Sequence, residues 1–290
     1  MTLKSAMKRI LVPCNFSSHS EMAFNFALEI AATQGAEVIV LTALKDSGDS
    51  QELESLDLAI AQNEIKFKAL LEKQVTLQVP VRHILRVGKI TPLVLKVIDE
   101  EKVDVVVMGT HGSRGWDGFF MGSNIEKVVR TSPVPVFAVK SNTAIKTVHN
   151  IVFPVSLNSE QNTVIEKVKE IQKLFRARIH LVRINTGASK NEAENLQKLK
   201  EFAEKNLLSN FTVYSRNALD IKDGIIDFAR EINADMIAMA THGNRGLNHL
   251  YAQSIAADVV NHANFLLWTC STAKISQTSL KQFKSGLYMA

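Results

Sequence analysis

The sequence predicts an α/β protein made of two similar modules. Continuous apolar segments alternate along the chain with segments of helical spacing, a pattern typical of a parallel sheet covered by helices on both faces. A seven-residue segment also occurs twice, as Gly-Thr-His-Gly-Ser-Arg-Gly at 109–115 and as Ala-Thr-His-Gly-Asn-Arg-Gly at 240–246. The copies begin 131 residues apart, at 109 and 240. That spacing is close to the length of one domain.

The composition is that of a globular protein without a strongly charged domain. The 290 residues, 46% of them hydrophobic, suffice for two domains with cores of their own. The net charge of +5 is spread thinly: residues 1–144 hold 16 Lys and Arg against 16 Asp and Glu, and residues 145–270 hold 15 against 13. Because neither half is basic, we expect no nucleic-acid partner.

Cysteine usage and hydropathy indicate the compartment. The two cysteines, Cys14 and Cys270, are far apart and form no CxxC motif, so they predict neither a disulfide framework nor a structural zinc site. The start of the chain lacks the apolar core of a signal peptide, and no run approaches the roughly 18 apolar residues of a membrane helix. We therefore expect a cytoplasmic protein with no membrane partner.

The first module begins with the apolar strand Arg9–Pro13, which ends in a turn where Ser17 or Ser18 can cap the next helix. That helix shows its spacing in Met22, Phe26 and Ile30. The predicted strands are Arg9–Pro13, Val38–Ala43, Leu77–Leu85, Val103–Met108 and Val134–Lys140, and the predicted helices cover 19–33, 50–74, Thr91–Glu101 and Asn124–Thr131.

The second module repeats this order in fewer residues. An offset of 141 places Pro13 on Pro154, whereas the offset at the glycine segments is 131, so the second copy is shorter by about ten residues. Its predicted elements are strands at Asn150–Val155, Phe211–Ser215, Met236–Met239 and Phe265–Thr269 and a helix at 189–208. We assign one domain to 1–144, a second to 145–270 and a polar extension to 271–290, with a polar linker at 141–148.

The glycine segment of the first module continues into a longer motif. Gly109 and Gly112 are followed, after nine residues, by Gly122 and Ser123. Glycines let backbone N–H groups approach an oxyanion without a Cβ in the way, and a helix N-terminus favours phosphate. Ser123 also opens a capping box that ends at Glu126. The loop therefore indicates a phosphate site, with a purely structural turn as the alternative.

This G-x2-G-x9-G-S pattern resembles the nucleotide-binding signature of the universal stress protein family, and the resemblance extends over residues 7–141 and 147–270. It implies a tandem universal stress protein. Each half would be a doubly wound, Rossmann-like domain of the adenine nucleotide alpha hydrolase-like type, with a five-stranded parallel sheet in the order 3-2-1-4-5. The ligand would then lie near the switch point between strands 1 and 4.

The resemblance also implies which residues hold ATP in the first half. The ends of the first two strands would line the adenine and ribose pocket, and the glycine loop would hold the phosphates, with Mg²⁺ as a candidate companion ion. Asparagine stands at position 15 where the family usually has aspartate, so it can bond a ribose or adenine but carries no charge. The cofactor-binding candidates are Pro13, Cys14, Asn15, Thr42, Ala43, Gly109, His111, Gly112, Arg114, Gly122, Ser123 and Asn124.

The second copy of the motif is degenerate. Ala240 replaces the first glycine, and Gln253-Ser254 replaces the Gly-Ser pair. Ser156 takes the aspartate position, and Arg183-Ile184 replace Thr42-Ala43. Arg183 can fill the base pocket itself or recruit a different anion. We expect that the second site does not bind ATP.

The loops contain little that indicates catalysis or a metal site. His111 and His242 have no Cys, Asp or Glu at ligand spacing, and Asp117 is the sole acid of the first loop. We expect no metal ligands and little or no ATP turnover, and hence a nucleotide-binding protein with a stress-response or regulatory role. The alternatives are a nucleotide-free interaction scaffold and an adenylyl-transferring enzyme, which is disfavoured because no Ser-Gly-Gly loop follows the first strand.

The last strand of each module is an apolar edge that must be covered. Family members cover it with the last strand of a partner, so the two halves of a tandem chain can pair with each other. This predicts an intrachain pseudo-dimer and leaves a homodimer open.

Overall fold

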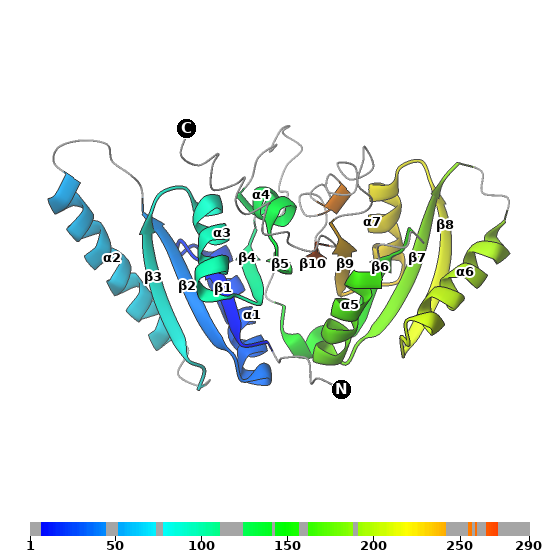
Figure 1. Cartoon of the computed structure of the whole chain (residues 1–290), viewed down its shortest axis with the longest axis horizontal. Helices are drawn as coiled ribbons and strands as arrows, with labels where there is room; N and C mark the ends of the chain where they lie inside the picture. The colour runs from blue at the N-terminus through cyan, green and yellow to red at the C-terminus, as the bar shows by residue number, and fades with distance from the viewer. Residues whose placement is uncertain are drawn as a thin grey trace.

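In the computed structural model, the described residues are 7–44, 52–73, 78–110, 124–140, 143–156, 162–187, 191–241, 255–256, 259 and 265–271. Their strands and helices alternate in each half of the chain (Figure 1). The first half contains β1 (Arg9–Pro13), α1 (Ser18–Gln34), β2 (Glu37–Leu44), α2 (Glu52–Glu72), β3 (Val81–Val87), α3 (Ile90–Glu101), β4 (Val105–Gly109), α4 (Asn124–Thr131) and β5 (Val136–Val139). After the short η1 (Ile145–Thr147) come β6 (Asn150–Pro154), α5 (Asn162–Phe175), β7 (Arg178–Thr186), α6 (Glu192–Lys205), β8 (Phe211–Ala218), α7 (Ile221–Glu231), β9 (Met236–Ala240) and β10 (Leu266–Cys270).

One ten-stranded sheet runs through both halves. Its order is β3-β2-β1-β4-β5-β10-β9-β6-β7-β8, so each half contributes five strands in the order 3-2-1-4-5. The strand pairs within each half are parallel, as in β1 with β2 and β6 with β7. The predicted fold class and strand order are therefore confirmed.

The two halves meet where β5 and β10 pair antiparallel. Leu267 lies opposite Ala138, and Trp268 lies opposite Phe137. Every residue of both strands is buried. The last strand of each half is thus covered by the other half, which removes two apolar edges from the surface.

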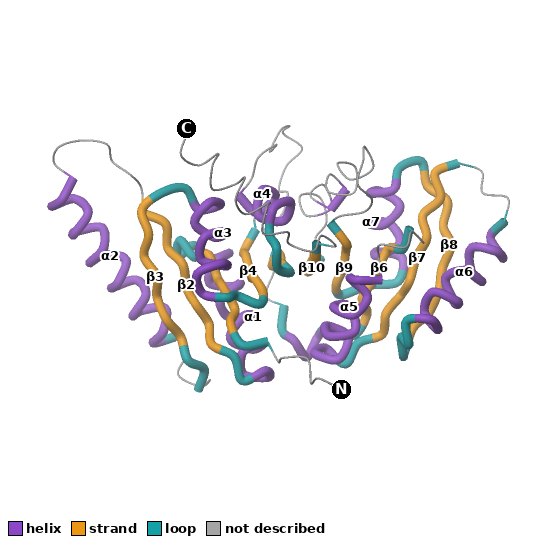
Figure 2. Tube along the Cα trace, in the orientation of Figure 1, coloured by secondary structure: helices purple, strands orange, loops and turns teal. Residues whose placement is uncertain are grey.

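Helices cover both faces of the sheet, and each face has its own core. The core on one face lies under α1, α2, α5 and α6, and the core on the other face lies under α3, α4 and α7. Figure 2 shows these helices flanking the continuous row of strands. Both cores extend across the β5–β10 joint, since each contains buried residues from the two halves.

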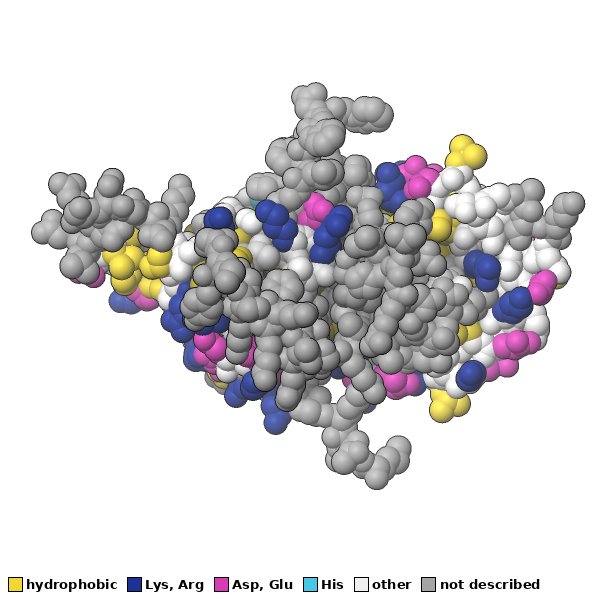
Figure 3. All heavy atoms as spheres, turned by 45° about the horizontal axis from the view of Figure 1, so that its top comes forward, with side chains coloured by type: hydrophobic (Ala, Val, Ile, Leu, Met, Phe, Trp, Pro, Cys, Tyr) yellow, Lys and Arg dark blue, Asp and Glu magenta, His cyan; other side chains and the backbone are white. Residues whose placement is uncertain are grey.

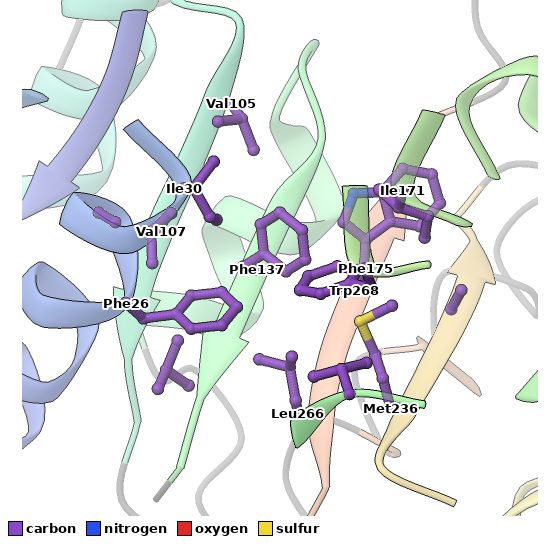
Figure 4. Close-up of a cluster of buried hydrophobic side chains, with 14 of the residues drawn as sticks. Phe26, Ile30, Val105, Val107, Phe137, Ile171, Phe175, Met236, Leu266 and Trp268 are labelled. Carbon is purple, nitrogen blue, oxygen red and sulfur yellow. The ribbon is translucent and has the colours of Figure 1, made fainter. Parts of the chain in front are cut away.

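Aromatic rings pack across the joint on the α1 and α5 face (Figure 4). The ring of Phe26 on α1 lies 5.5 Å from that of Phe137 on β5, in an edge-to-face arrangement. Phe175 on α5 is stacked on Phe26 at 6.3 Å and meets Phe137 edge-on at 6.1 Å. Trp268 on β10 is buried in the same core. Such pairs contribute beyond their buried area, so this cluster ties the two halves together.

Several boundaries agree with the sequence prediction and others correct it. β1 and α4 have the predicted bounds. Ser17 is the N-cap of α1, because its side chain accepts a hydrogen bond from the amide of Ser20. The third strand starts at Val81 rather than at Leu77: Pro80, which has no N–H, stands just before it and accepts a hydrogen bond from the amide of Val38.

The linker is more than the polar connection predicted from the sequence. The amide of Ile145 in η1 donates to Glu29 Oε2 on α1 over 2.8 Å. Val148 is completely buried and belongs to the core of the α1 and α5 face. Tertiary contacts with α1 therefore hold the described part of the linker in place.

In each half, one aspartate accepts hydrogen bonds from the amides at the start of the first strand. Asp104 Oδ2 accepts from the amides of Lys8 and Arg9 at 2.8 and 2.9 Å. Asp235 Oδ2 accepts from the amides of His149 and Asn150, both at 2.8 Å. The duplication thus extends to individual hydrogen bonds that the sequence analysis did not identify.

The surface mixes charges of both signs, and none of the described helices combines the length and apolarity that a membrane crossing requires. Described basic and acidic side chains are interspersed on the face drawn in Figure 3. Exposed ion pairs form among the described charges, such as Arg216–Glu231 at 2.6 Å.

We predict that Phe137→Ala lowers the free energy of unfolding by about 3–5 kcal/mol, because it empties a ring-sized space at the joint. Urea unfolding followed by circular dichroism measures this. Leu219→Ala is the control, since Leu219 is fully exposed and its truncation should change stability by less than about 0.5 kcal/mol. Equal effects of the two substitutions would contradict the importance of the joint.

Candidate functional site

The described candidates gather at the carboxyl ends of three neighbouring strands. Pro13 ends β1 and is followed by Cys14 and Asn15, Thr42 and Ala43 lie near the end of β2, and Gly109 ends β4. β1 lies between β2 and β4, so this is the point where the strand order reverses. Asn124 is the exposed first residue of α4. His111, Gly112, Arg114, Gly122 and Ser123 lie outside the described residues.

The turn after β1 is organised by its own side chains. The Cys14 amide donates to the Leu41 carbonyl over 2.8 Å, which continues the β1–β2 pairing. Asn15 is exposed, and its Oδ1 accepts from the Ser17 amide at 3.2 Å. Phe16 has φ of 60°, a left-handed conformation that is uncommon for an aromatic residue. Asn15 therefore already has a structural role in the turn, and Phe16 is a feature that the sequence did not indicate.

Thr42 and Ala43 occupy different environments, since successive strand residues face opposite sides of a sheet. Thr42 is buried, and its hydroxyl donates to the Cys14 carbonyl over 3.0 Å. Ala43 is half-buried. Thr42 thus acts on the turn after β1 from within the core, and Ala43 is the more accessible of the two.

His83 on β3 contacts the site through Thr42, although the sequence analysis did not select it. Its Nε2 lies 3.0 Å from Thr42 Oγ1 and its Nδ1 lies 3.1 Å from Glu64 Oε1 on α2. The ring stacks on Phe67 at 4.4 Å, and its side chain is only 4% exposed. Burial lowers the pKa of His83, while Glu64 partly opposes that shift. His83 is spaced two residues from Val81 and from Leu85, so the three share one face of the strand. A histidine on this otherwise apolar face is the signal that the sequence contains.

Gly109 has a packing role that is independent of any ligand. A Cβ at this position would overlap the main-chain carbonyl of His19 and would come within 2.9 Å of the Ser20 nitrogen. The first turn of α1 can therefore lie against the end of β4 only if residue 109 has no side chain. In the second half, Ala240 carries a methyl group at this position, and residues 157–161, which would correspond to this turn of α1, lie outside the described residues.

In the second half, one main-chain hydrogen bond of the site recurs among the described residues, and the side chains differ. The Val155 amide donates to Val182 O over 2.9 Å, as Cys14 does to Leu41 in the first half. Arg183, which replaces Thr42, is half-buried, and its Nε donates to Asn185 Oδ1 over 3.3 Å. Gln253 and Ser254 lie outside the described residues.

Both thiols are buried. Burial raises the pKa of Cys14, although hydrogen bonds with Ser20 and the Phe16 amide partly oppose the shift. Burial also raises the pKa of Cys270 to about 12. Within the described part of the chain, no group of three or more His, Cys, Asp and Glu side chains is placed to hold a metal ion.

The fold that brings the carboxyl ends of β1, β2 and β4 together is shared with known proteins. A model described as the universal stress protein family matches residues 7–140 and, a second time, residues 147–268. The chain belongs to the universal stress protein family. The double match makes it a tandem universal stress protein.

Relatives found by sequence and a solved structure of the same fold agree with this assignment. A universal stress protein of Methanocaldococcus jannaschii is 28% identical over 153 residues, which cover 46% of this chain and 94% of that protein. A second, of Thermus aquaticus, is 30% identical over 135 residues, which cover 46% of this chain and 98% of that protein. A solved universal stress protein structure from Archaeoglobus fulgidus has a TM-score of 0.75 at 17% identity and covers 91% of this chain and 98% of its own. That likeness shows that the fold of the whole tandem universal stress protein recurs.

We predict that Gly109→Ala lowers the free energy of unfolding by about 1–3 kcal/mol, because the added methyl group meets backbone atoms that cannot move aside. Thermal unfolding followed by circular dichroism tests this. Ala240→Gly is the matched control at the equivalent strand end, with an expected cost of about 0.5–1 kcal/mol. A Gly109→Ala variant as stable as the parent protein would contradict the packing role.

We also predict that neither thiol of the native protein reacts with Ellman's reagent at about pH 8, since the thiolate is the reactive form. Both pKa values are raised above the ordinary 9.0. Both cysteines should react once urea unfolds the chain. Rapid reaction of one thiol in the native protein would show that the Cys14 turn or the end of β10 opens to solvent.

Proposed function

We propose that the first half binds an adenine nucleotide, ATP in particular, and that the protein acts as a cytoplasmic regulatory or stress-response protein with little or no turnover. The observation that carries the proposal is the position of the complete glycine motif. Gly109 ends β4 and Asn124 begins α4, so the motif connects a central strand to a helix N-terminus at the switch point of the sheet. Backbone N–H groups and the helix dipole favour phosphate at such a place.

The roles of the individual candidates follow from this position. Pro13, Cys14, Asn15, Thr42 and Ala43 would form the adenine and ribose end, with Thr42 acting through the Cys14 carbonyl. Gly109, His111, Gly112, Arg114, Gly122, Ser123 and Asn124 would form the phosphate end. Mg²⁺ would accompany the phosphates. Since none of the described candidates is a carboxylate or an imidazole, they offer no general base for hydrolysis.

The second half is proposed to serve as a structural partner that does not bind ATP. The antiparallel β5–β10 pairing makes the two halves the intrachain counterpart of a dimer. We place the domain boundaries at 1–144 and 145–270, followed by the extension 271–290.

A nucleotide-free interaction scaffold is the second candidate, and one observation favours it. Gly109 is required by the packing of α1, so this glycine of the motif has a reason to be present without a ligand. The two candidates differ in whether Gly122 matters for ligand binding.

Isothermal titration calorimetry with ATP and Mg²⁺ tests the proposal. We expect the titration to give one ATP per chain. In a separate unfolding experiment, ATP at 100 times Kd should raise the free energy of unfolding by about 2.7 kcal/mol. Gly122→Arg should weaken binding more than tenfold, since a side chain then stands where the phosphates must approach the backbone. Gln253→Arg, at the equivalent position of the second half, should leave Kd and stoichiometry unchanged.

Two ATP per chain would contradict the asymmetry between the halves. An absence of binding at millimolar ATP, with identical melting curves for the parent and the Gly122→Arg variant, would favour the scaffold.

A further inference from the structure

A hydrogen-bonded relay runs from α2 to the turn after β1 and passes through a buried histidine. Glu64 Oε1 lies 3.1 Å from His83 Nδ1, His83 Nε2 lies 3.0 Å from Thr42 Oγ1, and Thr42 Oγ1 lies 3.0 Å from the Cys14 carbonyl oxygen. These links connect α2, β3, β2 and the end of β1. The relay therefore ends on the main chain of the proposed adenine and ribose pocket.

The position of the imidazole is fixed by its neighbours. Phe67 stacks on the ring at 4.4 Å with an interplanar angle of 23°, and Phe16 meets it edge-on at 6.1 Å. The His83 side chain is 4% exposed, whereas that of Glu64 is 43% exposed. A change of protonation at His83 must therefore be met by its partners rather than by rotation of the ring.

The number of protons on the His83 ring determines how many of the three hydrogen bonds of the relay can form at the same time. When Thr42 donates to the Cys14 carbonyl, Oγ1 can interact with His83 only by accepting a proton from Nε2–H. The Glu64 carboxylate likewise accepts a proton from Nδ1–H. All three links therefore require a proton on both ring nitrogens, which is the imidazolium form.

The neutral ring has to give up one link. A hydrogen bond to a carboxylate is stronger than one between neutral groups, so the single ring proton stays on Nδ1 beside Glu64. Nε2 is then an acceptor, and the Thr42 hydroxyl turns its proton toward His83. The Cys14 carbonyl thereby loses its donor, and the link between β2 and the turn after β1 is released.

The groups around the ring determine the direction in which the pKa of His83 moves. Glu64 is the charged group that α2 places beside the ring, and β2 contributes the neutral Thr42 hydroxyl. The turn after β1 contributes the Phe16 ring and, beyond Thr42, the Cys14 carbonyl. Arg82, the adjacent charge on β3, points to the opposite face, where it pairs with Glu37 and Glu101. Burial lowers the pKa of His83 below its ordinary 6.5, and Glu64 limits the decrease.

We propose that His83 is a positioning residue of the nucleotide site: its imidazolium form completes the relay and holds the turn after β1 in the geometry that binds nucleotide. The inference rests on the proposed function. The turn contains Phe16 in a left-handed conformation, which persists only where surrounding contacts hold it. A site that is already held binds its ligand at a lower entropic cost, so nucleotide binds the protonated form more tightly.

Coupling of this kind is reciprocal, so bound nucleotide must raise the pKa of His83. Nuclear magnetic resonance of the full-length protein, labelled at histidine, measures this between about pH 5 and pH 8, without ATP and at saturating ATP. We expect an increase of about 0.5–1 unit, equivalent to about threefold to tenfold tighter binding by the imidazolium form. In the ligand-free Glu64→Gln variant the pKa of His83 should fall, because the anion that stabilises the imidazolium is gone.

Calorimetric Kd values for ATP across the same pH range supply the second readout. The side chain introduced by His83→Gln can form hydrogen bonds but does not titrate. The Kd of this variant should therefore lack the part of the pH dependence that His83 causes, a factor of about three to ten. His180→Gln is the matched control: His180 is also buried with a lowered pKa, but it bonds Asn150 and Thr212 in the second half. Its pH profile should match that of the parent protein.

ATP binding accompanied by an unchanged His83 pKa would overturn this inference and leave the proposed function standing. An absence of ATP binding at every pH would overturn both. The resonance measurement on the unmodified protein gives this answer even if His83→Gln does not fold.

Discussion

The antiparallel pairing of β5 with β10 is the interaction on which the rest of the molecule depends. Each strand is buried along its whole length, so neither half could expose its last strand without presenting an apolar edge to solvent. Pairing turns two five-stranded sheets into one sheet of ten. Its outer strands, β3 and β8, carry arginines such as Arg82 and Arg216, and charged side chains of this kind protect an edge from further pairing.

Helix α1 links this joint to the candidate site. At its start, the His19 carbonyl lies against Gly109, and Ser17 caps the helix beside the turn after β1. Further along, Phe26 packs against Phe137 and Phe175 at the joint, and Glu29 holds the linker. Helix α1 thus contacts both the candidate site and the surface between the halves.

The two halves show how one backbone can serve different roles. Equivalent amides donate to equivalent carbonyls, as Thr110 does to Val139 and Thr241 to Cys270, both across the end of a central strand. The side chains at the candidate site have diverged, with Arg183 in place of Thr42 and Ala240 in place of Gly109. Equivalent main-chain hydrogen bonds are therefore kept in both halves although the side chains at these strand ends differ.

The sequence by itself determined the fold class, the duplication, the strand order through family resemblance, and local features such as β1, α4 and the cap of α1. These depend on periodicity, glycine spacing and capping within a few residues. Only the tertiary structure showed the start of β3 after Pro80, the anchoring of the linker by Glu29, the packing role of Gly109 and the contact of His83 with Thr42. Each of these joins residues far apart in the chain, and their meeting depends on strand register and helix placement, which no local pattern encodes.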